Sequence, residues 1–141
     1  VRTVLVVGAT DVAAALCALA APLGWRIVLI DSRDGALEEA SFAAATERLA
    51  ALPADAVTSR LGGARGTGTA VVIVAHDYKV ELPVLRVALR SGAPYVGMLG
   101  SRTRSGAVRA LLADVFGPAA LCIHRQAHVV DDHHQVHENR P

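Results

Sequence analysis

Four apolar segments, each ending in glycine or a polar residue, constrain the fold of this chain more than any other feature. They are Val4–Val7 before Gly8, Arg26–Ile30 before Asp31, Ala70–Ala75 before His76, and Tyr95–Leu99 before Gly100. Continuous apolar runs are typical of strands that are buried on both faces, as in a parallel sheet. Helical segments separate the runs. We therefore predict an α/β fold, a three-layer, Rossmann-like, doubly wound parallel sheet in a single domain.

The other elements are predicted from caps, breakers and composition. We expect helices from a cap at Asp11 to Ala21, from Ala36 to Leu52 with Pro53 as the stop, from Leu82 to Arg90, and from a cap at Ser101 to Val115 before Gly117-Pro118. Short strands are expected at Ala56-Val57 and at Ala120–Ile123, and a flexible glycine-rich loop at 62–68. Residues 1–123 form the predicted Rossmann-like domain. Residues 124–141 hold five of the six histidines and are predicted to be a poorly ordered tail.

Charge and cysteine content limit the class of protein and the cellular compartment that we expect. With 14 basic and 13 acidic residues, the chain lacks the basic surplus that is typical of nucleic-acid-binding domains. Its two cysteines, Cys17 and Cys122, form no Cys-x-x-Cys pair and suggest no disulfide framework, so we expect a cytoplasmic protein. The apolar start resembles a signal peptide, but Gly8 and Asp11 interrupt it and leave a run too short to cross a membrane.

The candidate binding site follows from where the strands end. In an open α/β sheet, ligands bind beyond the carboxyl ends of the strands, where the strand order reverses. All four strand ends should meet at this edge and line one cleft. The candidate residues there are Gly8, Ala9, Thr10, Asp31, Arg33, His76, Asp77, Gly100, Ser101 and Arg102.

The turn after the first strand is an incomplete dinucleotide fingerprint. Gly8 and Ala13 match the first and third positions of G-x-G-x-x-G/A, but Thr10 replaces the second glycine and Asp11 adds negative charge. An ordinary strand-to-helix turn with an aspartate cap is the alternative. Asp31 lies where an acid binds the ribose hydroxyls of NAD, and Arg33 suits a 2′-phosphate; a solvated loop pair is the alternative for both.

The two later strand ends carry groups suited to a polar or anionic ligand. A histidine such as His76 can act as an acid, a base or a ligand, and a buried histidine bonded to a backbone carbonyl is the alternative. Gly100, Ser101 and Arg102 combine helix amides with a guanidinium, which suits a phosphate. Ser101 as a plain helix cap is the alternative. The histidines of the tail form no closed four-ligand pattern, so we assign no metal site.

The segment from Ala75 to Arg102 resembles the Rossmann domain of the XdhC/CoxI family. The matching residues are Ala75-His76-Asp77, Leu82-Pro83-x-Leu85, Ala88-Leu89 and, most specifically, Gly97-x-Leu99-Gly100-Ser101-Arg102. Val4 to Ala9, Leu23-Gly24-Trp25 and Asp31-Ser32-Arg33 fit the same domain, and the likeness covers roughly residues 3–117. Gly-Ala-Thr-Asp stands where the family has Gly-Ala-Gly-His, and the family's glycine-rich continuation is missing after Leu121.

The resemblance implies an accessory role in maturing a molybdenum hydroxylase of the xanthine or carbon monoxide dehydrogenase type. Such a protein binds molybdenum cofactor, or a related phosphate-bearing nucleotide, and passes it on without turning over a small substrate. In this reading His76 and Asp77 orient polar groups of the ligand, while Ser101 and Arg102 hold its phosphate. The implied partners are the client enzyme, a separate XdhC N-terminal-type domain and, as a further option, a second copy in a homodimer.

Two other functions stay open from the residues alone. An NAD(P)-dependent oxidoreductase or nucleotide-binding module is favoured by Asp31 and Arg33 and opposed by Thr10 and Asp11. The third option is a domain that has lost its ligand and serves only as an interaction surface.

Overall fold

The computed structural model of the chain describes residues 2–62, 68–123 and 127–131, and the side chains of 102, 114–123 and 127–131 lie outside this description. Strands and helices alternate along it. In order they are β1 (Thr3–Val7), α1 (Asp11–Ala20), the 3-10 helix η1 (Ala21–Leu23), β2 (Arg26–Asp31), the 3-10 helix η2 (Ala40–Phe42), β3 (Glu47–Ala50), α2 (Pro53–Leu61), β4 (Thr69–Ile73), α3 (Tyr78–Arg90), β5 (Tyr95–Gly100), α4 (Arg102–Ile123) and β6 (Ala127–Asp131).

The described strands form one parallel sheet in the order β3-β2-β1-β4-β5-β6. The chain moves outward from β1 to β3 and then returns to β4 on the other side of β1, so the strand order reverses between β1 and β4. Val7 pairs with both Ile30 and Ile73, which aligns the carboxyl ends of β1, β2 and β4. The predicted Rossmann-like α/β domain is confirmed, and the switch point lies beyond β1 and β4.

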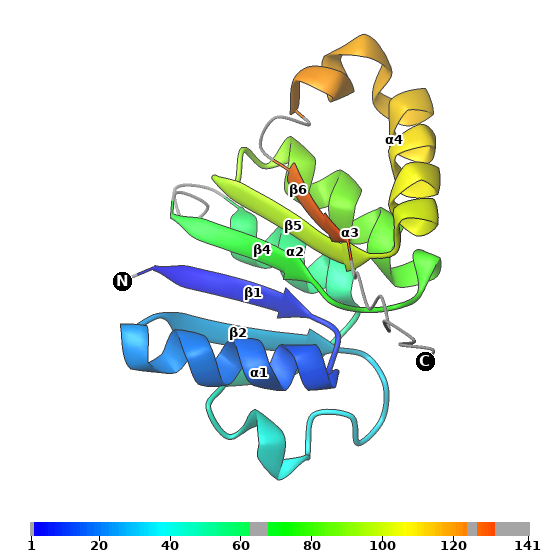
Figure 1. Cartoon of the computed structure of the whole chain (residues 1–141). Helices are drawn as coiled ribbons and strands as arrows, with labels where there is room; N and C mark the ends of the chain where they lie inside the picture. Colours follow the sequence, from blue (N-terminus) through cyan, green and yellow to red (C-terminus); the bar gives the residue numbers. More distant parts are fainter. Residues whose placement is uncertain (1, 63–67, 124–126, 132–141) are drawn as a thin grey trace, which may run out of the picture.

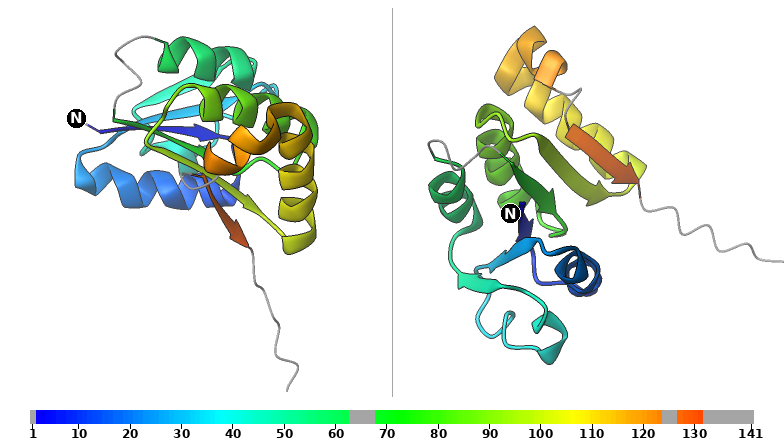
Figure 2. Two further views of the ribbon diagram at one scale, coloured as in Figure 1. Left: turned by 90° about the horizontal axis from the view of Figure 1, so that it is seen from above. Right: turned by 90° about the vertical axis from the view of Figure 1, so that its left-hand side faces the viewer.

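The helices cover the two faces of the sheet unequally (Figures 1 and 2). α2 and α3 pack on one face, against inward side chains such as Leu5, Val28 and Val71, and α4 joins this layer through Val108 and Leu112. α1 covers the opposite face over β1 and β2, where Val6 and Leu29 meet Ala13 and Cys17 of the helix. No helix of the described residues lies over β4 and β5 on the α1 side.

Between β2 and β4 the predicted elements are wrong. The alanine-rich segment 36–52 was expected to be one helix, but it contains η2 and the edge strand β3. Pairing with β2 overrides the helix propensity: β3 joins the ladder from Val28 to Asp31, and the Thr46 hydroxyl accepts a hydrogen bond from the Ile27 amide at 3.0 Å. Pro53 begins α2 instead of ending a helix, because proline has no N–H to lose at this position. Ala56-Val57, predicted as a strand, is buried within α2.

Towards the C-terminus the helices are longer than expected. α3 begins at Tyr78, four residues before the predicted start at Leu82, because Asp77 caps it there. α4 continues through Gly117-Pro118 to Ile123, so the predicted stop and the predicted strand at 120–123 are both wrong. Ala119, Ala120 and Leu121 of this extension are strong helix formers.

The sheet also includes five residues of the segment expected to be a poorly ordered tail. β6 pairs in parallel register with β5, from Val96 opposite Ala127 to Gly100 opposite Asp131. Val129 and Val130 are β-branched and suit a strand beside the edge of β5. The remaining tail residues, and most of the predicted loop at 62–68, lie outside the described residues.

Candidate functional site

The turn after β1 needs glycine because the backbone just beyond the end of β4 passes close to it. Gly8 has φ +105°, and a Cβ built on it would lie 2.7 Å from the Ala75 nitrogen and 2.8 Å from the Ala75 Cα. Such contacts are far inside van der Waals distance, and the backbone they involve follows β4 directly. The glycine that matched the first position of the fingerprint thus lets the ends of β1 and β4 approach each other.

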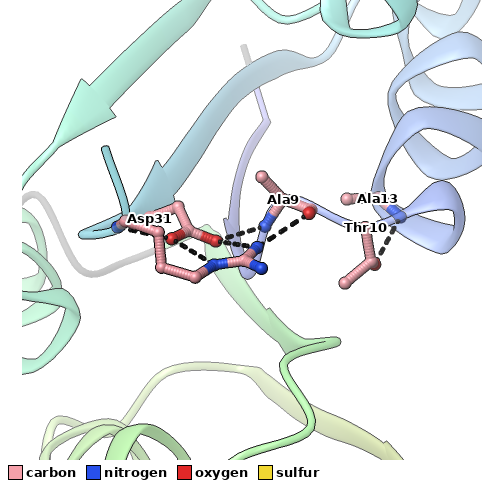
Figure 3. Close-up of polar contacts among 5 residues, drawn as sticks. Ala9, Thr10, Ala13 and Asp31 are labelled. Atoms are coloured by element: carbon pink, nitrogen blue, oxygen red, sulfur yellow. Dashed lines mark hydrogen bonds and ion pairs between the residues drawn. The ribbon is translucent and has the colours of Figure 1, made fainter. Parts of the chain in front are cut away.

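Thr10, which replaces the second glycine of the fingerprint, is the N-cap of α1. Its backbone is extended, and its Oγ1 accepts a hydrogen bond from the Ala13 amide at 3.3 Å (Figure 3). Asp11, predicted as the cap, is instead the exposed first residue of the helix. A cap must precede the first helical residue and reach back over the first turn, which Thr10 does.

Asp31 and Arg33 form a hydrogen-bonded clamp over this turn (Figure 3). The Asp31 Oδ2 accepts from the Ala9 amide at 2.7 Å and from Arg33 Nη2 at 2.8 Å. Its Oδ1 accepts from the Arg33 amide at 2.9 Å and from Arg33 Nε at 3.1 Å. Arg33 Nη2 also donates to the Ala9 carbonyl at 3.0 Å. A carboxylate has about four acceptor sites, so protein donors occupy all those of Asp31.

The clamp changes the ionisation of both side chains. Burial alone would raise the pKa of Asp31, but the hydrogen bonds from the Arg33 side chain and the Ala9 amide outweigh it and lower that pKa. The same bond raises the pKa of Arg33. The Asp31 side chain is 7% exposed while that of Arg33 is 64% exposed, so the clamp is anchored inside the fold and its guanidinium faces solvent.

Replacing Asp31 with asparagine should lower the free energy of unfolding by about 1.5–3 kcal/mol at pH 7, the range for hydrogen bonds to a charged group. Because the folded pKa lies below the value of about 3.9 for an unfolded aspartate, this stability is complete above that pH and is lost as the pH falls through the folded pKa. Urea unfolding of wild type, Asp31→Asn and the exposed-site control Asp34→Asn at pH 7 and pH 3 measures the free energy of unfolding of each protein. A wild-type advantage over Asp31→Asn that is equal at both pH values would contradict this explanation.

His76 and Asp77 follow β4 on the other side of the switch point. His76 is exposed, while the Asp77 side chain caps α3 by accepting from the Lys79 amide at 2.9 Å. Both residues face the turn after β1 across a shared cavity. Asp77 is thus held in place as the N-cap of α3, and the exposed His76 side chain lies next to it.

A cavity of about 320 Å³ lies at the switch point between β1 and β4. It brings together six of the candidate residues, and Ala9 takes part through its backbone bonds to the clamp. The cavity is lined by Gly8, Thr10, Ile30, Asp31, Ser32, Arg33, Pro53, Ala75, His76, Asp77 and Val80. Its position and size are those of a small-molecule site in an open α/β sheet.

Gly100 and Ser101 do not line this cavity, although we expected them to share a cleft with Gly8. β5 is separated from β1 by β4 in the sheet, which puts their ends roughly 10 Å apart. Ser101 caps α4, its Oγ accepting from the Arg104 amide at 3.3 Å. Arg102 is the first residue of α4, and its side chain lies outside the described part of the chain. These residues thus form a separate strand end.

Beside that strand end lies a buried ion pair that the sequence analysis missed. Glu81 is fully buried, and its Oε2 accepts from Arg104 Nη2 at 2.8 Å and Nε at 3.2 Å. Its Oε1 has no hydrogen-bond partner among the described residues. The Arg104 guanidinium carbon lies 4.4 Å from the centre of the Tyr78 ring. The signal was present: Glu81 shares the buried stripe of α3 with Val84, Leu85 and Ala88, at the spacing of one helix face.

Comparison with known proteins places this geometry in a family. The sequence model of the family described as the XdhC Rossmann domain matches residues 4–130 of the chain. The chain belongs to the XdhC Rossmann-domain family. This match extends beyond the resemblance at residues 3–117 and reaches into β6. No curated protein shows a significant match to the chain.

A solved structure is similar in fold to this XdhC domain. The domain resembles the crystal structure of a xanthine dehydrogenase from Bacillus halodurans, with a TM-score of 0.65 and 26% sequence identity. The alignment covers 76% of this chain and 31% of that chain. The XdhC domain described here thus spans about a third of the length of that protein.

The described residues contain neither a metal-binding cluster nor a membrane-spanning helix. Across the described side chains, no three His, Cys, Asp or Glu residues come close enough to hold a metal ion. The five histidines of the tail are not among those side chains. Within the described residues, no helix has the length and apolar character needed to span a bilayer.

Proposed function

We propose that this XdhC domain binds molybdenum cofactor, or a related phosphate-bearing nucleotide, in the switch-point cavity and so helps a molybdenum hydroxylase to mature. The client would be of the xanthine or carbon monoxide dehydrogenase type. The observation that carries the proposal is the cavity itself. It opens at the edge of the sheet where α/β folds bind ligands, in a chain that belongs to this family. The role is binding and transfer, and the cofactor supplies the redox centre once it is in the client enzyme.

The donors around the cavity fit the phosphate end of such a ligand. Arg33 lines the cavity, and its Nη1 makes no hydrogen bond within the described residues, while Nε and Nη2 are held by Asp31 and Ala9. The first backbone bond of α1 runs from Ala14 to Thr10, which leaves the amides of Asp11 and Val12 without a helical partner. A fixed guanidinium beside free helix amides is a favourable environment for a phosphate.

Other residues that line the cavity can orient polar groups of the ligand. His76 can donate or accept a hydrogen bond at the opposite wall, and Asp77 is held by its cap to Lys79. A volume near 320 Å³ lies at the small end of ligand sites, so it suits one phosphate-bearing moiety better than a whole dinucleotide. We assign to Ser101 and Arg102 a separate phosphate contact at the start of α4.

The clamp argues against the alternative of an NAD-dependent oxidoreductase. Binding the ribose diol requires free acceptor sites on the acid after β2, and protein donors fill those of Asp31. Releasing them would break hydrogen bonds to a buried charge, which is costly. The clamp therefore favours recognition of an anion by Arg33 over recognition of a diol by Asp31.

The proposal is tested by identifying what the protein carries. The domain is purified from cells that make molybdenum cofactor and denatured, and released pterins and nucleotides are identified by mass spectrometry. We expect a pterin or its nucleotide derivative. Release of NAD or NADP alone would support the oxidoreductase, and release of no ligand, together with no binding on titration, would favour an interaction domain.

Arg33→Gln should weaken binding of the released ligand about tenfold or more in calorimetric titration, because it removes a charge-assisted contact to phosphate. Arg26→Gln is the matched control: Arg26 is an exposed arginine at the amino end of β2, the strand that Arg33 follows, and it pairs with Glu47 at 3.1 Å. It should bind like wild type. Equal affinity of wild type and Arg33→Gln would show that the phosphate of the ligand does not bind in this cavity. A parallel Arg102→Gln variant would then test whether it binds at the start of α4.

A further inference from the structure

A second cavity, of about 690 Å³, adjoins the switch-point cavity. Ser32 and Arg33 line both cavities, so the arginine of the clamp lies between them. The second cavity is bounded by the end of β3 and by the segment after β2, which arches away from the sheet (Figure 1). Its volume lies within the range of small-molecule sites, roughly 300–1,000 Å³. A ligand whose phosphate binds in the first cavity can therefore extend into the second.

The floor of the second cavity is apolar. It is formed by Leu37, Ala50, Ala51 and Leu52. Leu52 is the N-cap of α2, where it makes no side-chain hydrogen bond and where leucine is strongly disfavoured. Its side chain is 66% exposed. Helix capping does not explain a leucine at this position, and a flat ring laid on the floor would cover it.

The charged side chains around this floor carry unused hydrogen-bonding groups. Asp34 and Glu38 line the cavity, and neither carboxylate forms a hydrogen bond with the described residues. Arg48 Nη1 donates to the Leu37 carbonyl at 2.9 Å, which holds this guanidinium at the cavity. Its Nε and Nη2 have no hydrogen-bond partner among the described residues. The rim thus offers both acceptors and donors.

These charges favour a neutral ring over a second phosphate. A phosphate in this cavity would meet the carboxylates of Asp34 and Glu38, and charges of like sign repel. A carboxylate can instead accept two adjacent N–H groups, and a guanidinium can donate to a carbonyl oxygen. The complementary ligand group is a planar heterocycle that carries an amino group, a ring N–H and a carbonyl oxygen along one edge.

We propose that the second cavity binds such a heterocycle, while the switch-point cavity binds the phosphate attached to it. This inference rests on the proposed function, which places the phosphate at Arg33. Glu38 accepts from the amino group and the ring N–H, and Arg48 donates to the carbonyl oxygen. The ring itself lies on the apolar floor. Pterins and guanine both carry this edge, whereas hypoxanthine lacks the amino group.

Calorimetric titration with guanosine monophosphate, inosine monophosphate and neopterin monophosphate tests this inference. The two nucleotides differ only in the 2-amino group of the base. Wild type should bind guanosine monophosphate and neopterin monophosphate about tenfold or more tighter than inosine monophosphate, because a hydrogen bond to a charged carboxylate is lost with the last. Glu38→Gln should lose the preference between the two nucleotides, because an amide oxygen cannot replace both acceptor oxygens of the carboxylate.

Glu39→Gln is the matched control, because it removes the same charge one residue further along the chain. Glu39 does not line the cavity, and its carboxylate accepts from the Ser41 hydroxyl at 3.2 Å. This variant should keep the wild-type preference for guanosine monophosphate. Glu38 is exposed and its carboxylate makes no hydrogen bond with the described residues, so Glu38→Gln should fold like wild type.

The variants Glu38→Gln and Arg33→Gln separate this inference from the proposed function. If Arg33→Gln weakens binding of both nucleotides and Glu38→Gln keeps the preference, the phosphate site stands and the heterocycle site is overturned. If Glu38→Gln loses the preference and Arg33→Gln binds like wild type, the phosphate site fails and the heterocycle site stands.

The wild-type titrations alone can also overturn the heterocycle site. Equal affinity for the two nucleotides would do so, as would the absence of binding of both guanosine monophosphate and neopterin monophosphate. With the preference present, tighter binding of neopterin monophosphate than of guanosine monophosphate would support a pterin as the bound ring. The reverse order would support a nucleobase with the same edge.

Discussion

Replacing Gly8 with alanine is expected to lower the free energy of unfolding by about 2–6 kcal/mol. At φ +105° an alanine would be held in a backbone conformation that only glycine adopts freely, and this strain costs about 1–3 kcal/mol. Its Cβ would also lie 2.7 Å from the Ala75 nitrogen. Pairing of Val7 with Ile73 holds the two backbones together, so this overlap adds the cost of an overpacked core, about 1–3 kcal/mol.

Gly24→Ala separates the cost of backbone strain from the cost of steric overlap. Gly24 has φ +71° and nothing within 4 Å of its missing Cβ, so alanine should cost only about 1–2 kcal/mol there. Urea unfolding of the three proteins gives both values. If Gly8→Ala were no less stable than Gly24→Ala, the close approach of β1 and β4 would not be what Gly8 is needed for. Because Gly8 and Ala75 both line the cavity, Gly8→Ala should also bind ligand less tightly.

The predicted strands that proved correct are those with a continuous apolar run, and in β1 and β2 this run is buried on both faces of the sheet. Val4–Val7 in β1 and Ile27–Ile30 in β2 are almost completely inaccessible to solvent, and a continuous apolar run is what such positions require. The edge strand β3 could not be found in this way. It is only four residues long, it is half exposed, and its residues Glu47 to Ala50 favour a helix when considered alone.

The candidate site was predictable in position but not in chemistry. Strand ends at one edge of a parallel sheet are implied by the topology, and six of the predicted residues do line one cavity. The sequence contains no information on how hydrogen bonds are distributed among them. Only the structure shows that Arg33 and the Ala9 amide together fill the acceptor sites of Asp31, or that Gly8 allows the close approach of Ala75.

The second large effect is expected at the buried pair of Glu81 and Arg104. Arg104→Met should lower the free energy of unfolding by about 3–5 kcal/mol, because it leaves a carboxylate buried without a counter-charge. Glu81 is fully buried, and within the described residues both hydrogen bonds that its Oε2 accepts come from Arg104. Its Oε1 already has no partner within the described residues, so no second donor there compensates for the loss.

The double variant Glu81→Leu with Arg104→Met distinguishes a buried charge from lost packing. Leucine at position 81 would continue the apolar stripe of α3 beside Val84 and Leu85, and no charge would remain buried. We therefore expect the double variant to be more stable than Arg104→Met alone by about 2 kcal/mol or more, as when buried ion pairs are replaced by apolar residues. Urea unfolding of wild type, both single variants and the double variant completes the cycle. Additive losses in the double variant would show that Glu81 and Arg104 do not act as a pair, and that Arg104 stabilises the fold through its contact with the Tyr78 ring instead.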